Sequence, residues 1–391
     1  MLTAEDCGIE VREDLGERLE LLRDSAKRFS DRPAHIARSR RLRGHQPGYD
    51  REVWREFANL GWLGARVPES FGGLGLGCTE IAVIAEELSS ALIPEPFTAA
   101  VVLAGGCIAY GDNENLKAEL LPTLVTGDLI PALAWREDQH DGNPLAVSTR
   151  AEEMRGGVKL FGVKRLVIAG ASADGVIVSA RTESGAVGLY WVRKNRIAGA
   201  TTYKALPDGR EMADIVFDGV EVPNADVLAS PDVAEGCLMR AYDDALVVTS
   251  AELIGVCEAV FALTLDYLRT RVQFGKPIGS FQSLQHRAAD IYIQLRMCRH
   301  TLDEVLATVV RAARAREEVS AEASRVKARC SDASLLVTRE AVQMHGAMGY
   351  SDECDVGLYL KRAITLSSWL GGADFHRKRY GKLALGLPAC A

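Results

Sequence analysis

The sequence lacks several features that would place the protein outside the cytoplasm or on a nucleic acid. Its first 22 residues contain no apolar core of a secretory signal, and we expect no apolar run long enough to span a bilayer. The formal net charge is −7, and there are no long basic runs. Nucleic acid is therefore excluded as an expected partner, because phosphate binding needs clustered positive charge. We predict a cytoplasmic protein that binds neither membrane nor nucleic acid.

Cysteine spacing excludes a second group of functions. The nine cysteines show no C-x-x-C pair, and their odd number argues against a disulfide framework. A reducing compartment fits this usage best. Cys107, Cys237, Cys257 and Cys330 lie among apolar residues and are expected to fill the core. No cluster of histidine, cysteine and aspartate has metal-ligand spacing, so we predict no metal.

The composition is that of an ordinary globular protein, with 48% hydrophobic and 25% charged residues in 391 positions. This length suggests two or three domains. The first part of the chain has helical periodicity. In residues 49–63, for example, Val53, Trp54, Phe57 and Leu60 fall on one helical face.

The periodicity changes twice along the chain, which predicts an α+β protein of three domains. Short β-branched runs separated by turn residues follow the first helices and indicate an antiparallel β domain, and long amphipathic helices with short joins then return. The expected strands are 157–163, 175–180, 187–192 and 213–222. The expected later helices are 234–271, 281–314, 320–345 and 356–385. The domains are an N-terminal helical domain (1–126), a middle antiparallel β domain (127–232) and a C-terminal four-helix bundle (233–391).

Two segments near the C-terminus carry groups that suit a nucleotide. Their sequences are RVQFGKPIGSFQ (271–282) and QMHGAMGY (343–350). Arg271 offers a fork of donors suited to a pyrophosphate, and Phe274 offers an aromatic face for an adenine. Gln343 can bond a ribityl or ribose hydroxyl, and Gly346 allows the backbone to approach a ligand closely.

Together these segments resemble the R-x-Q-F-G-x-P-I-x-x-F-Q and Q-x-H-G-G-x-G-Y motifs of the acyl-CoA dehydrogenases, and residues 54–73 (WREFANLGWLGARVPESFGG) resemble the same family. The resemblance covers essentially the whole chain and implies the same three-domain fold. In the family these two segments bind an FAD that is held mainly by a neighbouring subunit. The FAD contacts implied here are Arg271, Gln273, Phe274, Ile278, Phe281, Gln282, Gln343, Gly346 and Ala347.

The reaction implied is α,β-dehydrogenation of an acyl-CoA thioester, an oxidoreductase reaction in which a carboxylate removes the α-proton while hydride leaves for the flavin. The family places this glutamate at one of two positions, which correspond here to Leu370 and Ala245. Neither side chain can accept a proton. The family's arginine near the CoA portion is replaced by Leu246, whereas Asp243, a candidate substrate contact, is kept.

The segments that would contact this chain's own flavin also depart from the family. The T-E-P-x-A-G-S-D loop corresponds to residues 135–142, and the K-x-W-I-T-N-G stretch to residues 164–170. The indole and the hydroxyl that meet the isoalloxazine ring become Leu166 and Ile168. What this chain would give to a neighbour's flavin is therefore kept, while what it would give to its own is lost.

This difference between the kept and the lost residues suggests a non-catalytic subunit of a heteromeric acyl-CoA dehydrogenase that pairs with a base-bearing chain. Some bacterial enzymes acting on bulky or steroid-derived CoA thioesters are organised in this way. One alternative is a self-sufficient homo-oligomer with a displaced base, for which Asp244, Glu252 and His376 are the candidates. Carboxylates on amphipathic helices are usually solvated or paired, Glu252 lies about 10 Å along the helix from Ala245, and His376 is expected at the surface. The second alternative is a flavin-free scaffold with the same fold.

The resemblance also implies the partners. These are an acyl-CoA substrate from fatty acid or steroid catabolism, a homo- or hetero-tetrameric assembly, and an electron-transfer flavoprotein that accepts the electrons.

Overall fold

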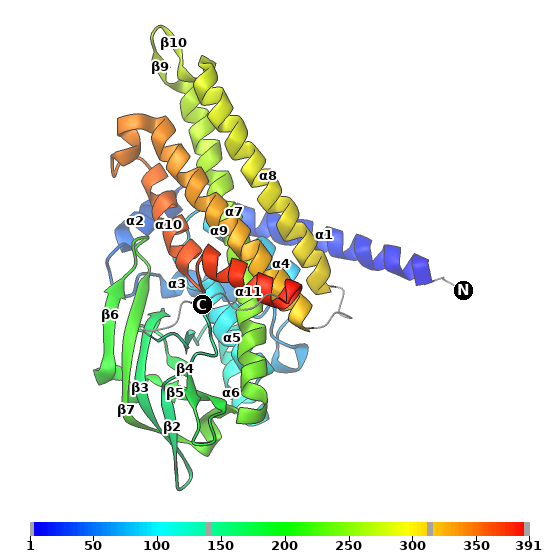
Figure 1. Ribbon diagram of the computed structural model, residues 1–391, viewed down its shortest axis with the longest axis vertical. Coiled ribbons are helices and arrows are strands. Elements are labelled where there is room, and N and C mark those ends of the chain that lie inside the picture. Colours follow the sequence, from blue (N-terminus) through cyan, green and yellow to red (C-terminus); the bar gives the residue numbers. More distant parts are fainter. Residues whose placement is uncertain (1–3, 138–141, 311–315, 387–391) are drawn as a thin grey trace.

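The computed structural model describes residues 4–137, 142–310 and 316–386, and it folds them into helices, a β-sheet and further helices (Figure 1). The first group of helices surrounds a common core. It consists of α1 (Ala4–Ser30), α2 (Ala34–Leu42), α3 (Arg51–Asn59), α4 (Cys78–Ser90), α5 (Gly105–Tyr110) and α6 (Glu114–Val125), with the short 3-10 helix η1 (Glu69–Phe71) and the π-helix η2 (Thr98–Ala104).

Helix α3 shows how local sequence builds this core. Asp50 caps the helix by accepting a hydrogen bond from the Glu52 amide at 2.9 Å. Trp54 and Phe57 are fully buried, as predicted. The expectation for Leu60 is wrong, since it is 40% exposed. The helix ends at Asn59, and the chain then turns through Gly61 at φ +75°, so Leu60 leaves the buried face.

The middle of the chain forms one eight-stranded sheet. Its strands are β1 (Pro131–Ala134), β2 (Arg150–Met154), β3 (Gly157–Ile168), β4 (Gly175–Arg181), β5 (Val187–Arg193), β6 (Thr201–Ala205), β7 (Glu211–Pro223) and β8 (Val227–Ala229). They lie in the order β6-β7-β3-β2-β4-β5-β8, with β1 added beside β4. The expected antiparallel sheet is in fact mixed, because β1 and β2 both pair with β4 in parallel. Parallel partners are joined by long connections, so turn signals in the sequence do not predict them.

The last part of the chain is helical again. It contains α7 (Pro231–Thr270), α8 (Gln282–Val310), α9 (Arg316–His345), α10 (Val356–Ser368) and α11 (Ala373–Leu385), with the small hairpin β9 (Val272–Gln273) and β10 (Lys276–Pro277) and the 3-10 helices η6 (Ile278–Ser280) and η7 (Gly346–Tyr350). The single helix expected over 356–385 is wrong. It breaks at a turn where Leu370 has φ +61° and Gly371 has φ +98°.

Helix α7 runs through the centre of the molecule (Figure 1). By length and composition it could cross a membrane, so the expectation that no apolar run is long enough is wrong. Of its apolar window, however, 72% is buried inside the protein, as in a core helix. Its backbone comes close to α4: a Cβ on Gly255 would lie 2.2 Å from the Glu86 carbonyl oxygen, so this contact requires glycine.

Candidate functional site

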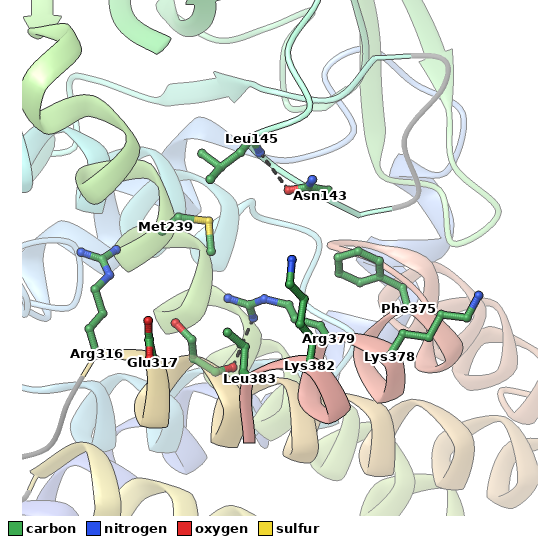
Figure 2. A pocket seen from close by; sticks show the side chains of 11 residues that line it. Asn143, Leu145, Met239, Arg316, Glu317, Phe375, Lys378, Arg379, Lys382 and Leu383 are labelled. Atoms are coloured by element: carbon green, nitrogen blue, oxygen red, sulfur yellow. Dashed lines mark hydrogen bonds between the residues drawn. The ribbon is translucent and has the colours of Figure 1, made fainter. Parts of the chain in front are cut away.

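A pocket of about 570 Å³ lies where the chain between β1 and β2 meets helices α7, α9 and α11. Figure 2 shows Asn143 and Leu145 facing the side chains of α9 and α11 across it. The apolar part of the wall comes from Leu145, Met239, Phe375 and Leu383, and the cationic part from Arg316, Lys378, Arg379 and Lys382. Apolar walls beside several cations suit a ligand that has both an apolar chain and anionic groups.

Asp243, the predicted substrate contact, does not line this pocket, but it is bound by two of the residues that do, Ser320 and Arg379. Arg379 Nη2 donates to its Oδ1 at 2.7 Å, and the Ser320 hydroxyl donates to its Oδ2. The residue is only 4% exposed. Burial raises the pKa of Asp243, and the Arg379 charge opposes that rise. Its carboxylate is therefore satisfied within the chain.

The two positions that the resemblance aligns with the family's base are both apolar and buried. Leu370 and Ala245 are each 0% exposed and belong to the main hydrophobic core. The Leu370 carbonyl oxygen is also in use: the Tyr242 hydroxyl donates to it, and His376 Nε2 lies 2.9 Å away. Neither position offers a group that could take up a proton.

The alternative bases are paired or buried. Asp244 Oδ2 accepts from Arg66 Nη2 at 2.7 Å and from the Tyr110 hydroxyl at 2.8 Å. Glu252 is 8% exposed, and burial raises its pKa. It lies about 10 Å along α7 from Ala245, too far for direct proton transfer.

The expectation that His376 lies at the surface is wrong. It is fully buried, and burial, followed by the nearby Lys327 charge, lowers the pKa of His376 well below its ordinary value. It follows a turn that folds back onto α9, so its polar neighbours in sequence give no sign of this burial. Lys327, which sequence reasoning missed, donates from the same core to the Ser367 carbonyl at 3.0 Å and the Gly371 carbonyl at 3.2 Å.

The predicted FAD contacts lie at the end of the bundle farthest from the sheet (Figure 1). The rings of Tyr267 at the end of α7 and His345 at the end of α9 stack with centroids 4.3 Å apart, which brings the two motif segments together. Phe274 is 91% exposed with φ +52° at the hairpin tip. Six more of the predicted contacts, in the segments 271–282 and 343–347 that we call the FAD-contacting arm, are exposed or half-buried, namely Arg271, Gln273, Ile278, Phe281, Gln282 and Gln343. Gly346, with φ +59°, and Ala347 are also exposed.

The segments predicted to contact this chain's own flavin are used for packing. Lys164 Nζ is fully buried and donates to Glu137 Oε1 at 2.7 Å and to Ser179 Oγ at 3.0 Å. Burial lowers the pKa of Lys164 to about 8, although Glu137 opposes this. Leu166 and Ile168, which the resemblance aligns with the family's indole and hydroxyl, are half-buried. Residues 138–141 of the expected substrate loop lie outside the described residues.

A long helical bundle, a β domain packed beneath it and a pocket at their junction define the acyl-CoA dehydrogenase fold. Family models described as the acyl-CoA dehydrogenase N-terminal domain and C-terminal domain match residues 16–128 and 238–384. The chain therefore belongs to the acyl-CoA dehydrogenase family, whose members are FAD-dependent oxidoreductases of acyl-CoA thioesters.

Similar proteins cover almost the full length. Acyl-CoA dehydrogenase FadE27 of Mycobacterium tuberculosis is 30% identical over 384 residues, which is 97% of this chain and 98% of that protein. Mitochondrial isovaleryl-CoA dehydrogenase of Pongo abelii is 28% identical over 343 residues, 85% of this chain and 80% of that protein.

Two solved structures are also similar. A variant of the Tcur3481-Tcur3483 steroid ACAD has a TM-score of 0.85 and 27% identity, over 95% of this chain and 99% of that one. The ChsE4-ChsE5 complex from Mycobacterium tuberculosis has a TM-score of 0.84 and 28% identity, over 95% and 98%.

Proposed function

We propose that this chain is the non-catalytic subunit of a heteromeric, FAD-dependent acyl-CoA dehydrogenase and that it completes the FAD site of a base-bearing partner chain. One observation carries the proposal. Both positions for the catalytic base, Leu370 and Ala245, are apolar and fully buried, while the FAD-contacting arm is exposed.

The chemistry of the family explains why the two apolar base positions support this proposal. Bound FAD accepts the hydride, but a protein carboxylate must remove the α-proton within hydrogen-bond reach. Asp244 is held by Arg66 and Tyr110. Asp243 is held by Arg379 and Ser320. Neither Asp243 nor Asp244 is therefore left to act as the base, and Glu252 lies about 10 Å along α7 from Ala245.

The exposed FAD-contacting arm also supports the proposal. Arg271 presents a guanidinium fork suited to a pyrophosphate, and the exposed ring of Phe274 can stack on an adenine. Strained, exposed aromatic residues are costly to keep unless a ligand or a partner covers them. In a second copy of this chain, the arm would face a flavin site with Leu166 and Ile168 in place of flavin-binding groups. We therefore infer that the arm completes the flavin site of a different chain.

The relatives support a two-component assembly and suggest a substrate class. Two of the similar structures are named for pairs of components, Tcur3481-Tcur3483 and ChsE4-ChsE5, and the first is called a steroid ACAD. We infer a bulky, steroid-derived acyl-CoA as the substrate of the assembly, with an electron-transfer flavoprotein as the electron acceptor. The cationic pocket of this chain, next to a missing base, would hold no productive substrate.

The test compares the chain purified alone with the chain co-expressed with a base-bearing acyl-CoA dehydrogenase from the same source. Alone, it should show no stoichiometric flavin absorbance and no acyl-CoA oxidation. The complex should hold one FAD for each pair of chains. Arg271→Gln with Phe274→Ala should strip FAD from the complex, while Arg269→Gln, an exposed arginine on the preceding helix end, should not.

Two results would overturn this reading. Tightly held FAD with turnover in the chain alone would mean a self-sufficient dehydrogenase. A complex that assembles without FAD, or that keeps FAD after the arm substitutions, would mean a scaffold.

A further inference from the structure

A second pocket, of about 560 Å³, is lined by Asp243 and shares Arg316 with the first pocket. It lies between the start of α4, the N-terminal third of α7 and the facing ends of α8 and α9. Its lining residues are Arg66, Leu76, Gly77, Cys78, Tyr110, Arg240, Asp243, Asp244, Thr308, Val309, Arg316 and Val319. None of these residues belongs to the FAD-contacting arm.

The carboxylates of this pocket are already neutralised. Asp243 is paired with Arg379, with a distance of 2.7 Å between Oδ1 and Nη2. Asp244 is paired with Arg66 at the same distance, and Tyr110 donates to the same oxygen. Arg66 Nη1 is buried without a hydrogen-bond partner among the described residues, so even this paired arginine keeps an unused donor.

Two further arginines of the wall have no carboxylate partner in the part of the chain that the structure describes. The Arg240 guanidinium lies over the Tyr110 ring, with its central carbon 4.1 Å from the ring centroid. This contact fixes the position of the group but leaves its N–H donors free. Arg316 donates to the Gly236 carbonyl, one helical turn before Arg240 on α7. The pocket thus holds uncompensated positive charge on two neighbouring forks.

We propose that this second pocket binds an oxyanion, a carboxylate or a phosphate, through Arg240 and Arg316 with Arg66 behind them. Planar guanidinium forks match the oxygens of either group in a bidentate way. A bound anion would join α7 to the start of α9 through a shared counter-charge. The apolar Leu76, Val309 and Val319 in the same wall leave room for a short carbon chain beside the charged group.

Isothermal titration calorimetry on the full chain, at low and constant ionic strength, tests this proposal. Inorganic phosphate and glutarate are the two probes, and chloride at equal ionic strength is the control anion. We expect saturable binding of at least one probe, and which one binds distinguishes a phosphate site from a carboxylate site. Arg240→Gln and Arg316→Gln should each weaken binding about tenfold or more, because each removes a charge-assisted hydrogen bond.

Arg296→Gln is the matched control, because Arg296 is exposed on α8 and does not line the pocket. Arg240→Lys, which keeps the charge but loses the fork, should bind with intermediate affinity. The proposal is overturned if neither probe binds saturably, or if Arg296→Gln weakens binding as much as the two pocket variants. Because the pocket uses none of the FAD-contacting residues, this result does not depend on whether the chain has a partner.

Discussion

Replacing Lys327 with methionine removes a fully buried amine from behind the turn that contains Leu370. Lys327 Nζ donates to Ser331 Oγ at 3.0 Å and to the backbone carbonyls of Ser367 and Gly371, and it has no carboxylate partner among the described residues. Burial lowers the pKa of Lys327 from its ordinary 10.5 to about 7. The fold therefore prefers the neutral amine.

The sign of the pH dependence follows from this direction. Between the two pKa values the unfolded chain binds the proton and the folded chain does not, so stability increases with pH. A lowering from 10.5 to about 7 corresponds to about 5 kcal/mol of preference for the neutral amine in the folded state. Of this, about 2 kcal/mol should be recovered between about pH 7 and about pH 9.

The assay is urea unfolding of wild type and Lys327→Met at several pH values in this range. Methionine has a similar length and stays uncharged. Titrations common to both proteins, such as that of Lys164, cancel in the difference. The free energy of unfolding of the wild type, relative to that of the variant, should increase as pH rises. Parallel curves would show that the amine is solvated or paired, and the reasoning would fail.

Three further predictions concern buried charge. Ala245→Glu restores a carboxylate at a base position but buries it unpaired, so it should cost about 3 kcal/mol or more and give no acyl-CoA oxidation; measurable turnover would contradict this. Asp244→Asn leaves Arg66 without its counter-charge and should lower the free energy of unfolding by about 2–4 kcal/mol, measured by urea unfolding; an unchanged midpoint would argue against the pair. Glu137→Gln strands the buried Lys164 amine and should cost about 3–5 kcal/mol, with the loss smaller at alkaline pH, where that amine is neutral; a loss that does not change with pH would refute it.

The order of the elements could be predicted because it depends on local patterns. Short β-branched runs separated by turn residues mark β3, β4, β5 and β7, and helical periodicity marks α7 to α9. The parallel pairing of β1 with β4 could not be predicted in this way, because its partners are far apart in the chain. The break between α10 and α11 was missed because Leu370 adopts a left-handed conformation that leucine rarely takes.

For the site, the sequence predicts that both base positions lack a carboxylate, but it does not predict how the residues around them pack. The absence of glutamate at positions 245 and 370 can be read directly from the residues. The partners of Asp243 come from α9 and α11, so only the packed bundle brings Ser320 and Arg379 to it. The burial of His376 has the same origin, since the turn before α11 folds it against α9.

These contacts show that the turn around Leu370 is stabilised by several side chains of the core. In the turn that contains Leu370, three side chains donate to backbone carbonyls: Tyr242 and His376 to that of Leu370, and Lys327 to that of Gly371. Gly142 from the β-domain side is packed so closely there that a Cβ on it would lie 2.7 Å from the Gly371 Cα. A glutamate side chain at position 370 would enter this filled core, whereas a working base must face a substrate. The surrounding residues thus stabilise this turn within the core, while the residues predicted to contact FAD are exposed or half-buried.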